Sequence, residues 1–157
     1  MSSVPSHMTA VLLTGHGGFD ALMASSEIPV PEVGDREVLI RVRAAGINNI
    51  DINTRTGWYA KGSNDTDDGA WNSVPLTLPR IQGADVCGEI VAVGRDVSTE
   101  RIGQRVIIEP VLREVAGETL ERAHYFGSEC DGGFAQFTKV ASVHAHHIDS
   151  KLSDEEL

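Results

Sequence analysis

Short runs of alternating apolar and polar positions recur along most of the chain. Residues 38–43, VLIRVR, change side-chain character with a period of two and are rich in β-branched residues, which is typical of a half-buried strand. Similar runs, bounded by glycine, proline or acidic turns, occupy residues 9–13, 22–31, 87–94, 103–112, 132–142 and 143–149. Strong helical periods are few. The pattern therefore predicts a mainly β fold, a largely antiparallel barrel or sandwich with a few short helices.

The first two runs are separated by TGHGGFD, residues 14–20. Glycine adopts the positive φ that a tight turn needs. We therefore expect an opening hairpin that turns at Gly15 to Gly18.

One domain is expected from the length of 157 residues. We place it at residues 9–150, behind a flexible leader at 1–8. Residues 151–157 are predicted to start a helix that leads to a further, missing domain, because Ser153 can cap it and two glutamates follow in its first turn. The long polar stretch 60–79 is expected to be a functional or mobile loop.

The net charge of the chain limits the classes of partner that it can bind. The chain has 13 Lys and Arg against 23 Asp and Glu, a formal net charge of -10, which argues against nucleic acid and anionic membrane. No apolar run approaches the ~20 residues of a spanning helix. With two isolated cysteines, Cys87 and Cys130, the chain suits a reduced compartment, and we expect a cytoplasmic protein.

Four segments in register carry a family resemblance. They are VLIRVRAAGINNIDINTRTGWY at 38–59, PRIQGADVCGEIVAVG at 79–94, IGQRVI at 102–107 and DGGFAQFTKV at 131–140. From about Met8 to Leu157 the chain resembles the N-terminal domain of the medium-chain dehydrogenase/reductases, the alcohol dehydrogenase and quinone oxidoreductase superfamily. The resemblance implies a GroES-like, partly open β-barrel that carries the substrate side of the active site.

In that family a Rossmann domain that binds NAD(P) follows the barrel. The paired glycines of GHGGFD and ECDGGF do not form the G-x-G-x-x-G turn that places a pyrophosphate at a helix N-terminus. We therefore expect no Rossmann domain in this chain and no tight dinucleotide binding by the chain alone.

The resemblance also bears on metal. Zinc-dependent members carry a cysteine ligand where this chain has Asn48 and a histidine ligand where it has Ala84, and a catalytic zinc needs three protein ligands. Asp85 alone is not a site, and Cys130 alone stands where relatives have four structural-zinc cysteines. We expect no zinc. The histidines of VHAHHID offer two ligands at most in a strand, and a solvated edge is the expectation there.

The segment GINNIDINTRTGWY instead matches the pattern of the zinc-free quinone oxidoreductase branch. It supplies the candidate cofactor-binding or substrate-binding residues Asn48, Asp51, Arg55 and Tyr59. An asparagine amide can donate to a carbonyl oxygen and hold a ribose or nicotinamide amide. The structural alternatives are a turn that bonds its own backbone for Asn48, a buried ion pair or strand-to-turn clamp for Asp51 and Arg55, and packing for Tyr59.

The leading hypothesis is the substrate-side domain of an NADPH- or NADH-dependent oxidoreductase that acts on a quinone, enone or other carbonyl compound, or on an alcohol. The resemblance implies a small-molecule substrate and a homodimer as a possible state of the full-length protein, with the fragment inactive alone. Two alternatives stay open: an alcohol dehydrogenase of zinc-dependent descent, and a stand-alone GroES-like binding or scaffold module without catalysis.

Overall fold

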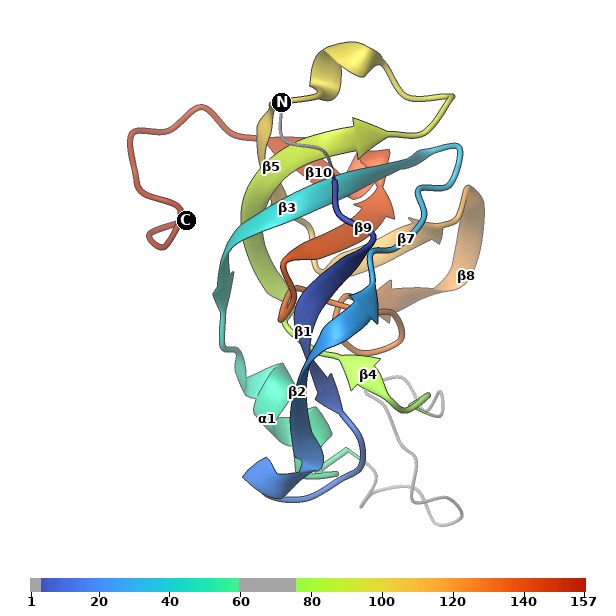
Figure 1. The fold of residues 1–157 in the computed structure, drawn as a ribbon. Helices are drawn as coiled ribbons and strands as arrows, with labels where there is room; N and C mark the ends of the chain where they lie inside the picture. Colours follow the sequence, from blue (N-terminus) through green and yellow to red (C-terminus); the bar gives the residue numbers. More distant parts are fainter. Residues whose placement is uncertain (1–3, 60–75) are drawn as a thin grey trace.

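The computed structural model describes residues 4–59 and 76–157 (Figure 1). Residues 60–75, most of the long polar loop expected at 60–79, lie outside the described residues. The strands are β1 His7–Leu13, β2 Leu22–Pro29, β3 Glu37–Gly46, β4 Arg80–Ile81, β5 Asp85–Val93, β6 Arg105–Ile108, β7 Val111–Val115, β8 Glu118–Tyr125, β9 Phe137–Ala141 and β10 Ala145–His147. Within these described residues the helices are α1 Asn49–Arg55 and the 3-10 turns Phe19–Ala21, Thr99–Arg101 and Ser142–His144.

A five-stranded antiparallel sheet in the order β10-β6-β5-β3-β9 forms the centre of the fold. Its long strands β3 and β5 curl around the core in Figure 1, and their pairing shifts register twice, between Leu39 and Ile40 and between Val42 and Ala44. Such bulges bend a sheet. The mainly β, largely antiparallel fold predicted from the strand pattern is therefore confirmed, and the curled sheet agrees with the partly open barrel that the resemblance implies.

The first part of β3, residues 37–40, is buried on both faces, whereas residues 41–46 are partly or fully exposed. Val38 and Ile40 belong to the main apolar cluster with Ile90 and Val106, whereas Leu39 packs with Met8 under a second sheet. That second sheet has the order β2-β1-β4. Alternation along 38–40 is absent because each face of β3 meets a different apolar layer.

The predicted opening hairpin is present. β1 pairs antiparallel with β2 from Leu13–Leu22 to His7–Pro29, and the chain reverses through residues 14–21. The leader expected at residues 1–8 is too long, since β1 begins at His7 and Met8 is buried in the second apolar cluster. The polar His7 gives no strand signal in the sequence, and it joins the sheet through its pairing with Pro29 of β2.

Two glycines show how closely the loop before β5 and the loop before β9 approach each other. Gly83 has a φ of +103°, and a Cβ there would come within 2.8 Å of the Phe134 backbone nitrogen. A Cβ on Gly133 would overlap Val86. Only glycine fits at these two contacts.

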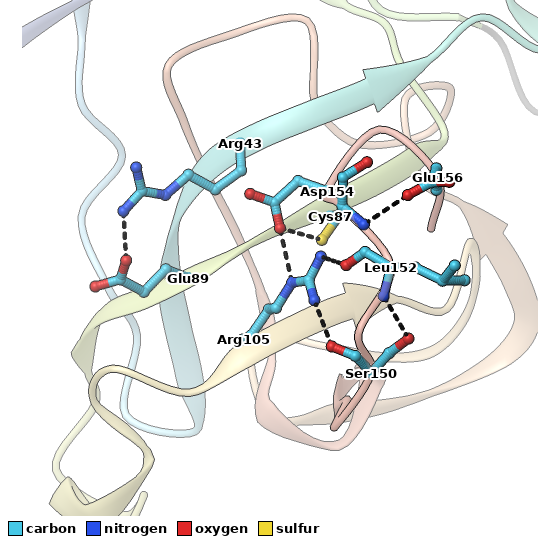
Figure 2. A network of polar contacts seen from close by, with 9 residues as sticks. Arg43, Cys87, Glu89, Arg105, Ser150, Leu152, Asp154 and Glu156 are labelled. Atoms are coloured by element: carbon cyan, nitrogen blue, oxygen red, sulfur yellow. Dashed lines mark hydrogen bonds and ion pairs between the residues drawn. The ribbon is translucent and has the colours of Figure 1, made fainter.

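The helix expected at 151–157 is not formed, and the segment is a series of bends. Its acidic side chains make other contacts, shown in Figure 2. Arg105 donates to Asp154 Oδ1 at 2.7 Å, to the Leu152 carbonyl at 2.7 Å and to the Ser150 carbonyl at 3.1 Å. Glu156 accepts from the Ser153 amide at 2.9 Å, which is half of a capping box without the helix. We call the three bonds from Arg105 to Asp154, Leu152 and Ser150 the Arg105 clamp.

Candidate functional site

Asn48 is exposed and uses both ends of its amide within the protein. It is the N-cap of α1, where its Oδ1 accepts from the Ile50 amide at 3.1 Å. Its Nδ2 donates to Asp85 Oδ2 at 2.9 Å. Asn48 therefore acts as a helix cap, as the structural alternative predicted. The cap and the bond to Asp85 also fix the direction of its side-chain amide, so capping is compatible with the hypothesis that Asn48 binds a ligand.

Asp51 lies below the surface, with 6% of its area exposed. Its carboxylate accepts from the backbone N–H of Asn48 at 2.8 Å, which completes a capping box, and from the backbone N–H of Gly83 at 3.0 Å. Burial raises the pKa of Asp51, and the backbone donors partly oppose that rise. Asp51 thus ties the start of α1 to the loop before β5.

Arg55 points to the opening hairpin. It donates to the Gly17 carbonyl at 2.7 Å, and its guanidinium lies 4.8 Å from the centre of the Phe19 ring. The buried ion pair considered for Asp51 and Arg55 is not formed. Both residues instead act as clamps. Asp51 holds the loop at Gly83, and Arg55 holds the hairpin turn at Gly17.

A cavity of about 390 Å³ opens at the N-terminal end of α1. Its wall brings together residues from four parts of the chain: Asn48, Asn49, Ile50, Asn53, Tyr59, Ala84, Asp85, Pro110, Val111, Tyr125 and Phe126. The Tyr59 hydroxyl accepts from Asn53 Nδ2 at 3.2 Å. Of the four predicted site residues, Asn48 and Tyr59 line this cavity, whereas Asp51 and Arg55 hold its supporting elements.

Asp85 is a further candidate for the site. The motifs indicate it only as a possible metal ligand, whereas the structure places it as an exposed carboxylate at the start of β5, held by Asn48. It lines the 390 Å³ cavity and also a neighbouring one of about 460 Å³, whose far wall includes Asp154 and Leu157. Its place directly after Ala84 in QGADVCG was the available signal.

The residues at this cavity do not fit a zinc ion. Ala84 has no ligand atom, the Asn48 amide is a poor ligand, and Asp85 is a single carboxylate. Across residues 4–59 and 76–157, no group of three His, Cys, Asp or Glu side chains could hold a metal ion. The absence of zinc from the protein itself stays a prediction.

His144 departs from the solvated edge expected for VHAHHID. It is 3% exposed, and its Nε2 lies 3.0 Å from the Arg113 amide and 3.1 Å from the Glu114 amide. Because Nε2 accepts both bonds, the ring proton is assigned to Nδ1, which donates to Glu109 at 3.1 Å. His146 is exposed and lies 3.4 Å from the same carboxylate. This bond with His144 is the main cause that lowers the pKa of Glu109.

Comparison with known proteins identifies the fold family. Residues 34–150 match the family described as the alcohol dehydrogenase GroES-like domain. The chain belongs to that family. This GroES-like domain is also 32% identical over 139 residues to the NADPH-dependent alkenal/one oxidoreductase of Arabidopsis thaliana, and 30% identical over 145 residues to the human quinone oxidoreductase.

These alignments cover 88% and 92% of this chain but 30% and 35% of the two relatives. The GroES-like domain therefore spans about a third of the length of the curated relatives it matches. Among solved structures, one described as an alcohol dehydrogenase from Sinorhizobium meliloti 1021 superposes with a TM-score of 0.87 at 42% identity, over 99% of this chain and 44% of that one. The superfamily expected from the four segments is thus confirmed. In the described part of the chain, no helix is both long and apolar enough to cross a membrane.

Proposed function

We propose that this GroES-like domain is the substrate side of a zinc-independent, NAD(P)H-dependent oxidoreductase acting on a quinone, an enone or another small carbonyl compound. The observation that carries the proposal is the cavity at α1, where Asn48, Asp85 and Tyr59 replace a metal ligand set with hydrogen-bonding groups. The alkenal/one oxidoreductase and quinone oxidoreductase relatives support the substrate class.

Reduction of a carbonyl needs a hydride at carbon and stabilisation of the negative charge that develops on oxygen. NAD(P)H bound by a following domain would supply the hydride. Asn48 Nδ2 carries two hydrogens, of which Asp85 receives one, so the second can donate to the substrate oxygen. Asp85 and the α1 cap fix that direction before substrate arrives, and such preorganisation is what lowers the barrier.

Tyr59 supplies a second polar group on the same wall. Asn53 donates to its hydroxyl oxygen, which orients the phenol O–H as a donor. In this role Tyr59 would protonate or hydrogen-bond the reduced oxygen. Asp51 and Arg55 would affect catalysis only by holding α1 and the hairpin.

The test uses a longer protein that includes the dinucleotide-binding domain. Asn48→Ala should lower kcat/KM for a small quinone by roughly a hundredfold, the usual effect of losing one oriented donor to a developing oxyanion. Gln136→Ala is the matched control, because it removes an exposed side-chain amide whose one hydrogen-bond partner among residues 4–59 and 76–157 is the Thr9 backbone N–H. Unchanged turnover with a lowered Tm would show that Asn48 is only a helix cap.

Metal content is tested separately. Purified protein should contain well below one zinc per chain, and stoichiometric zinc that survives a chelator would overturn the zinc-independent proposal. Assays with NADPH and NADH in parallel decide the nucleotide.

Oxidation of an alcohol is the second candidate function, favoured by the S. meliloti structure at 42% identity. The same cavity would then receive the alcohol, NAD(P)⁺ bound by a following domain would accept the hydride, and Asp85 would be the nearby carboxylate able to accept the hydroxyl proton. Measuring both reaction directions separates the two candidates. A homodimer and a cytoplasmic location remain proposals for the full-length protein, and one relative is chloroplastic.

A further inference from the structure

Asp85 is the only charged side chain in the wall of the cavity at α1, counted over residues 4–59 and 76–157. Its Oδ2 accepts from Asn48 Nδ2 at 2.9 Å. No Lys, Arg or His of the same residues forms an ion pair with it. The wall of the proposed substrate site therefore carries one negative charge that no cation in the described part of the chain balances.

The bond between Asn48 and Asp85 sets how close a substrate would come to this charge. The two hydrogens on an amide nitrogen point about 120° apart, and each hydrogen bond spans about 2.9 Å. Since Asp85 receives one hydrogen of Asn48 Nδ2, a substrate oxygen bound to the other would lie ~5 Å from the Asp85 carboxylate. The reacting end of a substrate held in this way lies beside the charge.

The neighbouring cavity of about 460 Å³ extends the same negative wall. It shares Asp85 with the cavity at α1 and adds Asp154 and Glu155, and no cationic side chain of the described residues lines it. Asp154 is paired with Arg105 at 2.7 Å (Figure 2). Glu155 has no ion pair within residues 4–59 and 76–157. A substrate that extends in this direction meets a further carboxylate and no balancing cation of the described wall.

We propose that Asp85 is a specificity-determining residue, which makes the site select uncharged carbonyl compounds and reject those that carry a carboxylate or another anionic group. The inference rests on the proposed function and narrows the substrate class of the same cavity. Two unit charges ~5 Å apart, in surroundings between water and protein, change a binding constant roughly tenfold. Tight binding of an anion would need a cationic partner, and the described wall supplies none.

The test compares two enones of nearly the same size in the longer protein that includes the dinucleotide-binding domain. trans-Acetylacrylamide ends in an uncharged amide, and trans-acetylacrylate ends in a carboxylate. At low salt the amide should have the higher kcat/KM, by roughly tenfold. If only a small quinone is reduced, the two compounds are compared as inhibitors of that reduction, and the same ratio is expected between their inhibition constants.

A charge-removing variant assigns the preference to one residue. Asp85→Asn keeps an oxygen that can accept from Asn48 Nδ2, so any change in orientation affects both enones alike, while the ratio between them should fall close to one. Asp35→Asn is the matched control. It removes an exposed carboxylate before the start of β3, whereas Gly46 at the other end of that strand pairs with Asp85. This control should keep the native ratio, although it changes the net charge by the same amount.

Salt gives a second measurement on the native protein. Because salt screens charges near the surface, the preference for the amide should narrow as the salt concentration rises to ~0.5 M. Equal use of both enones, no inhibition by either, a ratio that persists in Asp85→Asn, or a ratio that salt does not change would each overturn the inference. A protein that reduces neither the enones nor a quinone would instead contradict the proposed function itself.

Discussion

The Nε atom of Arg105 lies 2.7 Å from Oδ1 of Asp154, although 49 residues separate the two along the chain. The same Asp154 oxygen lies 3.5 Å from the Cys87 thiol (Figure 2). The Arg105 clamp therefore fixes the segment after β10 across β5 and covers a thiol with it. Cys87 is 3% exposed, and its pKa is raised by burial and by the neighbouring Asp154 carboxylate.

Breaking the clamp should expose Cys87. We expect Arg105→Gln to raise the rate of Cys87 alkylation by iodoacetamide at pH 8 by at least tenfold, because three contacts that hold residues 150–154 are lost. Peptide mass spectrometry over time measures each thiol separately. Arg43→Gln is the control, since Arg43 lies on the same face but pairs with Glu89 (Figure 2). An equal rise at Cys130 would indicate general unfolding, and no rise at Cys87 would contradict the role of the clamp.

Cys130 should show an unusual pH profile. Burial raises its pKa to about 12, and only the thiolate is alkylated. Its rate in the folded protein should thus keep climbing about tenfold per pH unit from pH 7 to pH 10, where an ordinary thiol with a pKa of ~8.5 levels off. A plateau near pH 9 in folded protein would contradict the burial of this thiol.

His144→Ala should destabilise the domain. The change leaves the Arg113 and Glu114 amides without their acceptor and opens a buried space, so we expect a loss of about 2–3 kcal/mol in the free energy of unfolding. His146→Ala is matched to it, because His146 contacts the same Glu109 from an exposed position, and should cost about 0.5 kcal/mol or less. Urea titrations compare the two, and equal losses would count against the buried network.

The same network predicts an acid dependence. The pKa of Glu109 is lowered in the folded state, chiefly by the hydrogen bond from His144. A carboxyl with a depressed folded pKa stabilises the protein above its unfolded pKa and loses that contribution as pH falls through the folded pKa. The difference in unfolding free energy between the native protein and Glu109→Gln should therefore shrink below about pH 4.5. A difference that is constant from pH 7 to pH 3 would argue against the contribution of this charge.

Gly133→Ala should be poorly tolerated. The new methyl group would overlap the Val86 side chain of β5, and overpacking of this kind costs about 1–3 kcal/mol. Gly15→Ala is the comparison, since nothing lies within 4 Å of a Cβ there. Melting temperatures of the two variants decide the matter: a similar Tm for both would mean that the loop can shift to make room.

The sequence predicted the barrel well because β-branched runs and glycine turns act locally. The opening hairpin and the strand at 38–43 needed no knowledge of distant residues. The second apolar layer over Leu39 could not be predicted in the same way, because burial of that face depends on β1 and β2 packing across it. The helix predicted at 151–157 is not formed for a similar reason, because Asp154 is held by the distant Arg105 of β6.

The candidate site likewise has a part that the local sequence predicts and a part that depends on distant residues. Asn48 and Tyr59 belong to one short motif, and both line the cavity. The motif could not show that Asp51 and Arg55 turn away to hold loops, because their partners Gly83 and Gly17 are distant in sequence. Nor could it identify Tyr125 and Phe126, which reach the cavity from the end of β8 and carry no motif of their own.

The contact between the glycine loops at Gly83, Gly127 and Gly132 has a consequence for redesign of this domain. A Cβ on Gly132 would come within 2.5 Å of the Gly83 carbonyl oxygen, and one on Gly127 within 2.9 Å of the Gly83 amide nitrogen. Here main chain rests on main chain, with no side-chain layer that a mutagenesis library could trim or enlarge. If the cavity at α1 binds substrate as proposed, its shape is therefore changed most directly at the lining side chains Tyr125, Val111 and Asn53.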